Sequence, residues 1–298
     1  MSKAVKAQKT IVLGIPKGSL QEATVKIFSM AGFRIGVSER SYFPSIDDDQ
    51  INLVLVRAQE ISRYVEEGVL DCGITGEDWI RENDSNVARL ADLVYAKQSL
   101  RPVRWVLAVS DDAPIHSVKN LQGKRVATEL VKVTQRFLKD NHVNAEVEFS
   151  WGATEAKVKR GLVDAIVELT ETGASLRANG LRIVTTVCES TTKFIANKQA
   201  YKDAWKKKKI DNIVLLLQGA IEAYNRVGLK LNVHKKNLEK VRALLPALNT
   251  PTVSSLMRKD WYALEVVVEE RIVRELIIRL KDAGAEGIIE YSLNKIVY

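Results

Sequence analysis

A short loop that follows an apolar strand pattern carries residue types suited to binding an anion. The segment DAIVELTETGASLRANGL begins at Asp164, and its apolar stretch runs directly into Thr170–Ser175. Backbone N–H groups in a tight glycine-containing loop can converge on one point, and Thr and Ser hydroxyls add donors. These features favour a phosphate. An ordinary strand–loop–helix junction, in which Thr and Ser only cap the helix, explains the same residue types equally well.

Two carboxylates accompany this loop and need a separate explanation. Glu168 and Glu171 would repel a phosphate that they faced, so in a binding role they would contact sugar hydroxyls or a hydrated Mg²⁺. The residues expected to surround the ligand are Glu168, Thr170, Glu171, Thr172, Gly173, Ala174 and Ser175.

A second candidate anion site lies near the start of the chain, in the sequence Pro16-Lys17-Gly18-Ser19-Leu20. Lys17 supplies a point charge, Gly18 permits close backbone approach, and a helix that begins near Ser19 favours an anion at its N-terminus. A simple helix-capping loop is about as good an explanation. Two such loops together predict a cleft that holds a ligand with two phosphate-bearing ends.

Other polar residues occupy the ends of predicted strands, where α/β proteins place binding groups. Taken singly, each charged residue among them is better explained as part of a surface ion pair. The residues at these strand ends, expected near a phosphate-bearing ligand, are Arg57, Asp71, Gly76, Glu77, Arg101 and Arg104.

Several classes of chemistry lack their sequence motifs. His116, His142 and His234 are scattered, and neither Cys72 nor Cys188 has a nearby Cys or His to complete a ligand pair. Metalloprotease, serine-hydrolase, dithiol and dinucleotide motifs are missing. We therefore expect reduced structural thiols and no dedicated metal site.

The elements that would position these residues alternate between strand and helix patterns from Thr10 to about Ile195, which predicts an α/β fold. We expect one lobe from residues 1–108 together with 196–225, and a second lobe from residues 109–195. After Arg226 the pattern changes, since VGLKLNVH alternates strictly between apolar and polar positions. The order βαββαβ predicts a ferredoxin-like domain over residues 226–298.

Composition narrows the class of protein further. The 298 residues are 46% hydrophobic and 28% charged, with a net charge of +8, which is typical of a globular chain and suits either nucleic acid or phosphorylated ligands. The run Lys206–Lys209 is best interpreted as the solvated face of a helix, and no nucleic-acid motif accompanies it. We expect no membrane span, no export signal and a cytoplasmic location.

Longer segments resemble one enzyme family. The segments that carry the resemblance are GIPKGSL, LVRAQEISRYVEEGVLDCGITGEDW, SLRPVRWVLAV, EFSWGATEAKV, DAIVELTETGASLRANGL and GAEGIIEYSLNKI. Together they cover nearly the whole chain and resemble the ATP phosphoribosyltransferases, in their long form with a C-terminal regulatory domain. The resemblance implies two catalytic lobes of the type II periplasmic-binding-protein-like fold, followed by the ferredoxin-like domain.

The resemblance also implies a reaction, in which N1 of ATP attacks C1 of phosphoribosyl pyrophosphate and pyrophosphate leaves. This pentosyl transfer is the first step of histidine biosynthesis. Glu168 would lie near the ribose, Thr170–Ser175 around the 5-phosphate, and Lys17 and Gly18 near the pyrophosphate. Mg²⁺ would arrive on the pyrophosphate, with help from Glu168 or Glu171, instead of occupying its own protein site.

The family further implies a homohexamer in exchange with dimers, feedback inhibition by L-histidine, and competition by AMP or ADP at the nucleotide site. The residues expected near the inhibitor are Thr252, Ser254, Ser255, Ala285 and Gly287. A turn and edge strand followed by a helix C-cap would explain the same residues. Two rival classes are a two-lobed solute-binding or small-anion-binding protein without catalysis, and a basic nucleic-acid-binding protein.

Overall fold

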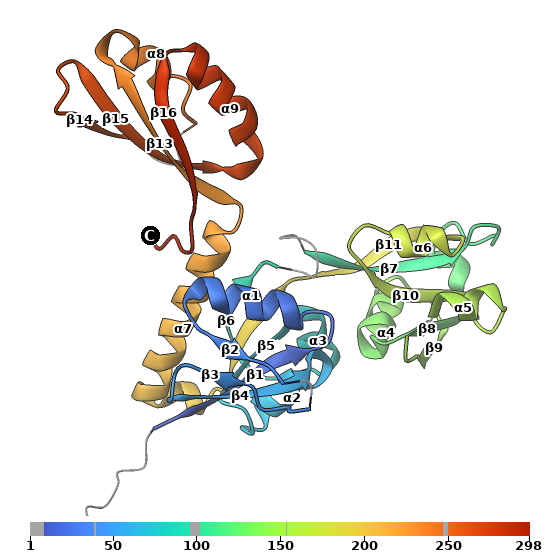
Figure 1. Ribbon diagram of the computed structural model, residues 1–298. Helices are drawn as coiled ribbons and strands as arrows, with labels where there is room; N and C mark the ends of the chain where they lie inside the picture. The colour runs from blue at the N-terminus through green and yellow to red at the C-terminus, as the bar shows by residue number, and fades with distance from the viewer. Residues whose placement is uncertain (1–8, 39, 96–101, 153, 247–249) are drawn as a thin grey trace, which may run out of the picture. The chain divides into compact units, whose positions relative to one another are not determined.

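The computed structural model describes residues 9–38, 40–95, 102–152, 154–246 and 250–298, which divide into two compact units (Figure 1). The first unit comprises the described residues up to Lys26 and Phe33–Val214, and the second comprises Ile27–Gly32 and Leu215–Tyr298. Over these ranges, no helix combines the length and the apolar character needed to cross a lipid bilayer.

One five-stranded sheet of the first unit is built mainly from the beginning of the chain. Its strands, in spatial order, are β4 (Ile51–Arg57), β1 (Ile11–Lys17), β5 (Cys72–Gly76), β12 (Thr192–Ala196) and β6 (Ala88–Leu93). β4, β1 and β5 run parallel, whereas β12 is antiparallel to both of its neighbours. The associated elements are α1 (Gln21–Ala31), the short pair β2 (Ile35–Gly36) and β3 (Ser45–Ile46), α2 (Ala58–Glu66) and α3 (Glu77–Glu82).

The second sheet repeats this order. Its strands are β9 (Glu146–Phe149), β8 (Arg125–Thr128), β10 (Ala165–Thr170), β7 (Val103–Ser110) and β11 (Leu181–Ser190). The helices of this part are α4 (Val131–Asp140), α5 (Thr154–Lys159) and α6 (Ala174–Ala178). In each sheet, the strand that arrives from the other sheet lies between the third and last strands. This repeated topology confirms the predicted two-lobed, type II periplasmic-binding-protein-like fold.

The strand pairing corrects the expected boundaries between the lobes. β7 pairs with β10 and β11, so it belongs entirely to the second sheet, and β12 pairs with β5 and β6 in the first sheet. The chain therefore crosses between β6 and β7 and again between β11 and β12, earlier than the expected boundaries at 108/109 and 195/196. An apolar strand has the same sequence pattern whichever sheet it joins. Only its pairing partners in the structure show to which lobe it belongs.

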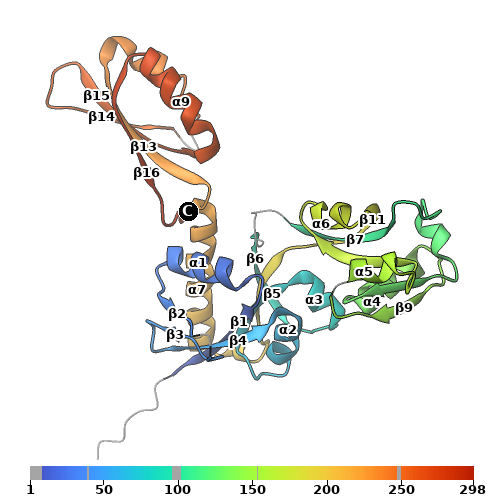
Figure 2. The same ribbon diagram turned by 45° about the vertical axis from the view of Figure 1, so that its right-hand side comes forward.

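The C-terminal part of the second unit follows the 20-residue helix α7 (Ala204–Ala223). Its elements are β13 (Arg226–His234), α8 (Leu238–Arg242), β14 (Thr252–Ser255), β15 (Trp261–Glu269), α9 (Glu270–Asp282) and β16 (Ala285–Ser292). The four strands form an antiparallel sheet in the order β14-β15-β13-β16, and α9 lies along one face (Figure 1 and Figure 2). This is the predicted ferredoxin-like fold.

Alternation in the sequence explains the packing of this sheet. Val227, Leu229, Leu231 and Val233 on β13 are buried, as the period of two requires. They share a core with buried apolar residues of the α9 helix, among them Leu276 and Leu280. Burial of an aliphatic side chain contributes about 1.5–3 kcal/mol, so this shared core supplies the main driving force for the domain.

The lysine run lies in α7, but its interpretation as a fully solvated face is wrong for two residues. Lys206 Nζ lies 2.6 Å from Asp71 Oδ1. Lys209 Nζ lies 2.6 Å from Asp48 Oδ2 and donates to Gln50 Oε1 at 3.0 Å. The exposed fraction of the Lys209 side chain is only 16%. These contacts attach the start of α7 to the segments that precede β4 and β5. Lys206 and Lys209 therefore stabilise the fold.

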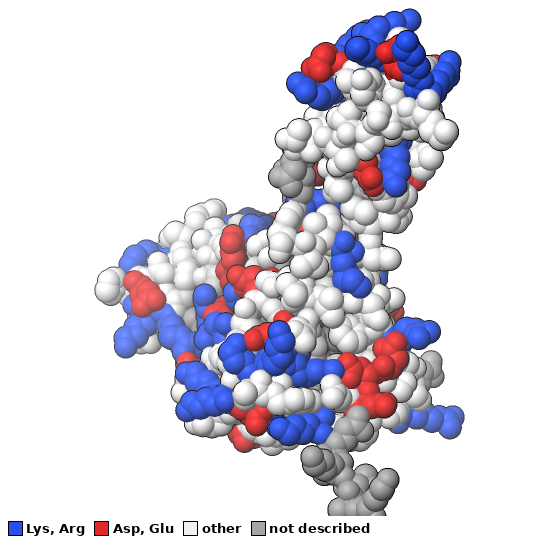
Figure 3. Space-filling model, turned by 90° about the vertical axis from the view of Figure 1, so that its left-hand side faces the viewer, with Lys and Arg blue, Asp and Glu red and all other residues white. Residues whose placement is uncertain are grey.

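One face of the molecule disperses its positive charge (Figure 3). In the space-filling view of one face, Lys and Arg side chains lie among Asp and Glu side chains instead of forming a continuous stripe (Figure 3). A dispersed charge of this kind does not supply the extended electrostatic footprint of a nucleic-acid-binding surface.

Replacing Lys209 with Ala should lower the free energy of unfolding by roughly 1–2 kcal/mol, because it leaves Asp48 without its cation and Gln50 without its donor. Chemical denaturation followed by circular dichroism measures this loss. Lys208→Ala is the matched control, since the neighbouring Lys208 is exposed on the same helix turn. Equal stability of the two variants would contradict the anchoring role of Lys209.

Candidate functional site

A cavity of about 350 Å³ lies where the C-terminal ends of strands from both sheets meet the two chain crossings. Ends of parallel strands are the usual binding position in α/β proteins. The lining residues are Pro16, Lys17, Ser19, Leu20, Arg57, Ala58, Gln59, Gly76, Asp78, Trp79, Tyr95, Val103, Trp105, Glu129, Glu168, Leu169, Thr170, Glu171, Ser190, Thr191 and Thr192.

Two cations line the part of the cavity that belongs to the first sheet. Lys17 and Arg57 are the last residues of β1 and β4, and the parallel register places them opposite each other. Lys17 Nζ lies 3.9 Å from the centre of the Tyr42 ring. Gly18 follows with φ +106°, and a Cβ built at Gly18 would lie 3.3 Å from Arg57 Nη1. The backbone turn therefore holds two positive charges at one sheet edge, which suits an anion.

Carboxylates line the part of the cavity that belongs to the second sheet. Glu168 on β10 accepts hydrogen bonds from the Thr154 hydroxyl and from the backbone N–H of Leu169. Burial raises the pKa of the Glu168 carboxyl, and the negative charges of Glu155 and Glu129 act in the same direction. The Glu168 carboxylate therefore lies in a site that disfavours its charge, and a cationic or hydrogen-bond-donating ligand would stabilise it.

Only part of the predicted phosphate loop reaches the cavity. Thr170 and Glu171 line it, whereas Thr172, Gly173, Ala174 and Ser175 are not among its lining residues. Gly173 adopts φ +73°, and its N–H donates to Thr170 Oγ1 at 2.7 Å. Ser175 Oγ donates to Glu155 Oε1 at 3.1 Å. The loop is thus held tightly by its own side chains at the cavity edge.

Four residues at the base of the cavity were not predicted from the sequence. Asp78 and Trp79 lie in the first turn of α3, Trp105 lies on β7, and Ser190 ends β11. Trp79 and Trp105 pack edge to face, with ring centroids 5.9 Å apart. Burial raises the pKa of the Asp78 carboxyl, against hydrogen bonds from the Trp105 indole and the Trp79 backbone that lower it.

The other polar lining residues that the sequence did not predict are Gln59, Tyr95, Glu129, Thr191 and Thr192. Gln59 and Glu129 come from different sheets, and Gln59 Nε2 donates to Glu129 Oε2 at 3.3 Å. Their positions just after β4 and β8 were a usable signal. Tyr95, Thr191 and Thr192 lie next to the chain crossings. They were not predicted, because the sequence analysis placed both crossings too late in the chain.

The cavity brings together Lys17, Arg57, Gly76, Glu168, Thr170 and Glu171 from the predicted set. Gly18 and Arg104 do not line it, and Arg101 lies outside the described residues. Arg104 is on β7, opposite Thr170 and Glu189 in the strand register.

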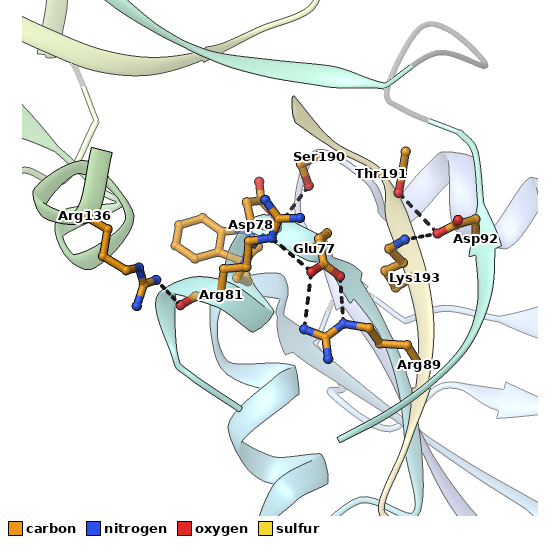
Figure 4. Close-up of polar contacts among 10 residues, drawn as sticks. Glu77, Asp78, Arg81, Arg89, Asp92, Arg136, Ser190, Thr191 and Lys193 are labelled. Carbon is orange, nitrogen blue, oxygen red and sulfur yellow. Dashed lines mark hydrogen bonds and ion pairs between the residues drawn. The ribbon is translucent and has the colours of Figure 1, made fainter. Parts of the chain in front are cut away.

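Two predicted site residues, Asp71 and Glu77, do not line the cavity and form ion pairs outside it. Asp71 precedes β5, at the opposite end of that strand from the cavity, where it accepts a hydrogen bond from Val12 N at 2.9 Å and pairs with Lys206. Glu77 pairs with Arg81 at 3.1 Å and Arg89 at 3.0 Å (Figure 4). Burial raises the pKa of Glu77, but the hydrogen bonds from Arg89 and Arg81 outweigh this and lower it.

The predicted inhibitor residues lie at opposite edges of the C-terminal sheet. Thr252, Ser254 and Ser255 are exposed on β14, whereas Ala285 and Gly287 are on β16. β15 and β13 separate these two edge strands. Within one copy of the domain, the two sets therefore do not form a single pocket.

No group of three or more His, Cys, Asp or Glu side chains suited to holding a metal ion occurs within the residues that the structure describes. The carboxylates of the cavity, Glu168 and Glu171, offer the hard oxygen donors that Mg²⁺ accepts. This donor set fits a metal that keeps most of its other ligands from water or substrate.

The fold and the cavity define a two-lobed α/β protein whose cleft carries cations at the ends of β1 and β4 and carboxylates on the side of the second sheet. Comparison with known proteins identifies the family. A family model described as ATP phosphoribosyltransferase matches residues 57–219, and one described as HisG, C-terminal domain, matches residues 223–295. The chain belongs to the ATP phosphoribosyltransferase family.

Individual relatives agree over almost the full length. An ATP phosphoribosyltransferase of Chlorobium luteolum is 57% identical over 98% of this chain and 99% of its own. One of Thermodesulfovibrio yellowstonii is 57% identical over 97% and 99%, respectively. Among solved structures, a chain of the ATP phosphoribosyl transferase (HisG:HisZ) complex from Thermotoga maritima is 27% identical, with a TM-score of 0.61. That match covers 72% of this chain and 98% of the other chain.

Replacing Glu168 with Gln should stabilise the ligand-free protein at pH 8, raising Tm by roughly 2–4 °C. Because the pKa of Glu168 is raised in the folded protein, its charge penalises folding above that pKa and the penalty disappears on protonation. The advantage of the variant should shrink as the pH falls through the raised pKa toward the ordinary value of 4.5. Thermal unfolding across this range tests it.

Glu146→Gln, at an exposed position on β9, controls for the removal of one negative charge. A wild-type protein as stable as Glu168→Gln at pH 8 would contradict the prediction.

Proposed function

We propose that this protein transfers the phosphoribosyl group of phosphoribosyl pyrophosphate to N1 of ATP and releases pyrophosphate, in the first step of L-histidine biosynthesis. The observation that carries the proposal is one cavity, in a member of this family, with Lys17 and Arg57 on one side and Glu168, Thr170 and Glu171 on the other. Cations on one side suit pyrophosphate, and carboxylates on the other suit ribose hydroxyls.

Each end of phosphoribosyl pyrophosphate then has its own partners. Lys17, Gly18 and Arg57 bind the pyrophosphate, because two cations and an open glycine backbone converge at the ends of β1 and β4. The loop Thr170–Ser175 holds the 5-phosphate at the cavity edge. Glu168 and Glu171 contact the ribose hydroxyls, which removes part of the cost of burying the Glu168 carboxylate.

The chemistry needs positioning more than proton transfer. N1 of adenine carries its own lone pair, so the nucleophile needs no general base. As the bond from C1 to pyrophosphate breaks, positive charge grows on the ribose and negative charge on the leaving group. Carboxylates near the ribose and cations near the pyrophosphate stabilise these charges where they develop.

The reaction uses a divalent metal, which we propose is Mg²⁺ carried by the pyrophosphate. Mg²⁺ retains several waters and usually binds through one or two carboxylates together with substrate phosphates. Glu168 or Glu171 can supply such a carboxylate. When bound, the metal neutralises charge on the leaving group.

The two sheets form the catalytic lobes, and the ferredoxin-like domain is regulatory. The proposed boundaries follow the chain crossings between β6 and β7 and between β11 and β12. The lobes close on substrate by a hinge motion at these crossings. AMP and ADP, which retain adenine, compete for the nucleotide site. Because ATP and phosphoribosyl pyrophosphate are intracellular metabolites, we place the enzyme in the cytoplasm.

Regulation by L-histidine requires more than one copy of the chain. The candidate residues Thr252–Ser255 and Ala285–Gly287 occupy opposite sheet edges, so a pocket that uses both sets must form between two copies. Contact between unlike edges is heterologous, and it closes into a ring when the rotation permits. A homohexamer in exchange with dimers accommodates such rings. The inhibitor then acts by binding one global state better than the other.

The direct test is incubation of the purified protein with ATP, phosphoribosyl pyrophosphate and Mg²⁺. We expect pyrophosphate release and a change in adenine absorbance, both dependent on all three components. Tight binding of phosphoribosyl pyrophosphate without any product would favour the rival function, a two-lobed anion-binding protein, and would rule out the transferase.

Replacing Gly173 with Val should weaken binding of phosphoribosyl pyrophosphate at least tenfold, with little effect on ATP. Gly173 has φ +73°, and an added Cβ would lie 2.9 Å from Arg177 Nη1 and 3.2 Å from Ile183 Cδ1. A β-branched residue in the left-handed region costs about 1–2 kcal/mol, which corresponds to roughly a tenfold change if it is expressed in the bound loop.

Isothermal titration with each substrate separately measures the effect. Gly161→Val is the matched control, because Gly161 has φ +67° but open space around its Cβ position. Equal losses for both substrates would argue against the phosphate assignment.

Replacing Ser254 with Trp should abolish inhibition by L-histidine and leave catalysis intact. Ser254 is exposed on the edge strand β14, so a bulky side chain fits the isolated domain but blocks a pocket formed at that edge. Initial rates over a range of histidine concentrations, together with sedimentation velocity, measure inhibition and assembly. A wild-type enzyme unaffected by millimolar histidine would end the regulatory proposal.

A further inference from the structure

Asp78 lines the cavity and is hydrogen-bonded to two strands of the second sheet. It is only 4% exposed. Its Oδ2 accepts the indole N–H of Trp105 at 2.6 Å. Its backbone N–H donates to Ser190 Oγ at 3.1 Å (Figure 4). α3 follows β5 of the first sheet, whereas Trp105 and Ser190 belong to β7 and β11 of the second. One residue therefore connects both crossing strands to the first sheet.

The surrounding backbone leaves room for this carboxylate. A Cβ built at Gly76 would lie 2.0 Å from Asp78 Oδ1 and 3.3 Å from Ser190 Oγ. Gly76 has φ −80°, which any residue adopts, so its conformation does not require glycine. The close approach of the Asp78 carboxylate does require it. The sequence Gly76-Glu77-Asp78 thus fixes where this carboxylate lies.

The neighbouring carboxylate has a different role. Glu77 is also buried, at 8% exposure, but its partners Arg81 and Arg89 come from α3 and β6, both on the side of the first sheet. Figure 4 shows the Glu77 carboxylate directed to these arginines, while Asp78 lies beside Ser190. Glu77 therefore forms ion pairs within one lobe, whereas the adjacent Asp78 forms hydrogen bonds to the other lobe.

The partner of Asp78 is tied to the acidic side of the cavity by strand register. On β7, Trp105 lies opposite Leu169, and the residues on either side of Leu169 are Glu168 and Thr170. Trp105 is only 2% exposed. A displacement of the Trp105 backbone would therefore be transmitted through the β7–β10 ladder to Glu168 and Thr170.

We propose that Asp78 is a positioning residue for phosphoribosyl transfer. By holding the indole of Trp105, it sets the separation between the cationic groups at the ends of β1 and β4 and the acidic groups of β10. This inference rests on the proposed transferase function. Asp78 acts through Trp105 and Ser190, so its removal changes how well bound substrates are aligned more than how tightly they bind.

Steady-state kinetics of Asp78→Ala, Asp78→Asn and Glu77→Gln test the proposal. Misplacement of about 1 Å can cost about 10²-fold in rate, so kcat of Asp78→Ala should fall about 10²-fold, with each KM within about threefold of wild type. Asp78→Asn keeps one acceptor oxygen, so it should recover about tenfold of that loss. Glu77→Gln should lower Tm but keep kcat within about twofold.

Trp105→Phe provides a second route if Asp78→Ala does not fold. It keeps an aromatic ring but removes the indole donor, and it should reproduce the loss of kcat. The proposal is overturned if folded Asp78→Ala keeps kcat within about threefold of wild type, or if Glu77→Gln loses as much. An inactive wild-type protein would instead refute the transferase function, so the two failures are distinguishable.

Discussion

The double crossing of the chain between two sheets is the constraint on which the cavity depends. Tyr95, which follows β6, and Thr192, which begins β12, both line the cavity. Thr192 Oγ1 donates to the carbonyl of Tyr95 at 2.8 Å, and the Tyr95 hydroxyl lies 2.8 Å from Thr24 Oγ1 on α1. Tyr95 and Thr192 are buried, so an unpaired group here would cost about 1–3 kcal/mol. Tyr95 and Thr192 are therefore fixed to each other and to the helix that follows Lys17.

The charges of Glu168 and Lys17 lie on opposite sides of the cavity. They lower the stability of the ligand-free protein, and they suit the proposed substrate. Within the described residues, the Glu168 carboxylate is buried near other carboxylates, while the Lys17 ammonium lies over the face of the Tyr42 ring. Neither charge has a strong ionic partner within that part of the chain. In the proposed site, the ribose hydroxyls and a metal-bound pyrophosphate supply both partners. The protein thus gives up stability where binding recovers it.

Features that follow from a local sequence pattern could be predicted, whereas features that depend on contacts between distant residues could not. The β13 alternation and the loops after β1 and β10 are local patterns, and they predicted the C-terminal fold and residues such as Lys17 and Thr170. Asp71 and Glu77 have residue types that suit a binding site. Only the strand direction and the positions of Lys206 and Arg89 reveal that both form ion pairs outside the cavity. Trp105 carries no local signal, because its role depends on pairing with β10 and on contact with Asp78.

At the edges of the C-terminal sheet, the proposed inhibitor site depends on contacts between copies of the chain, which a local sequence pattern does not reveal. β14 is a short exposed edge, and β16 is interrupted by a register shift around Gly287, which has φ +56°. A short edge and a bulged edge resist continuous strand addition between copies. Copies that meet edge to edge would then leave polar backbone groups unpaired, and a small zwitterion has the donors and acceptors to satisfy them. This geometry supports the proposal that an amino acid binds between unlike edges of two copies, because one copy offers only one of the two edges at any such contact.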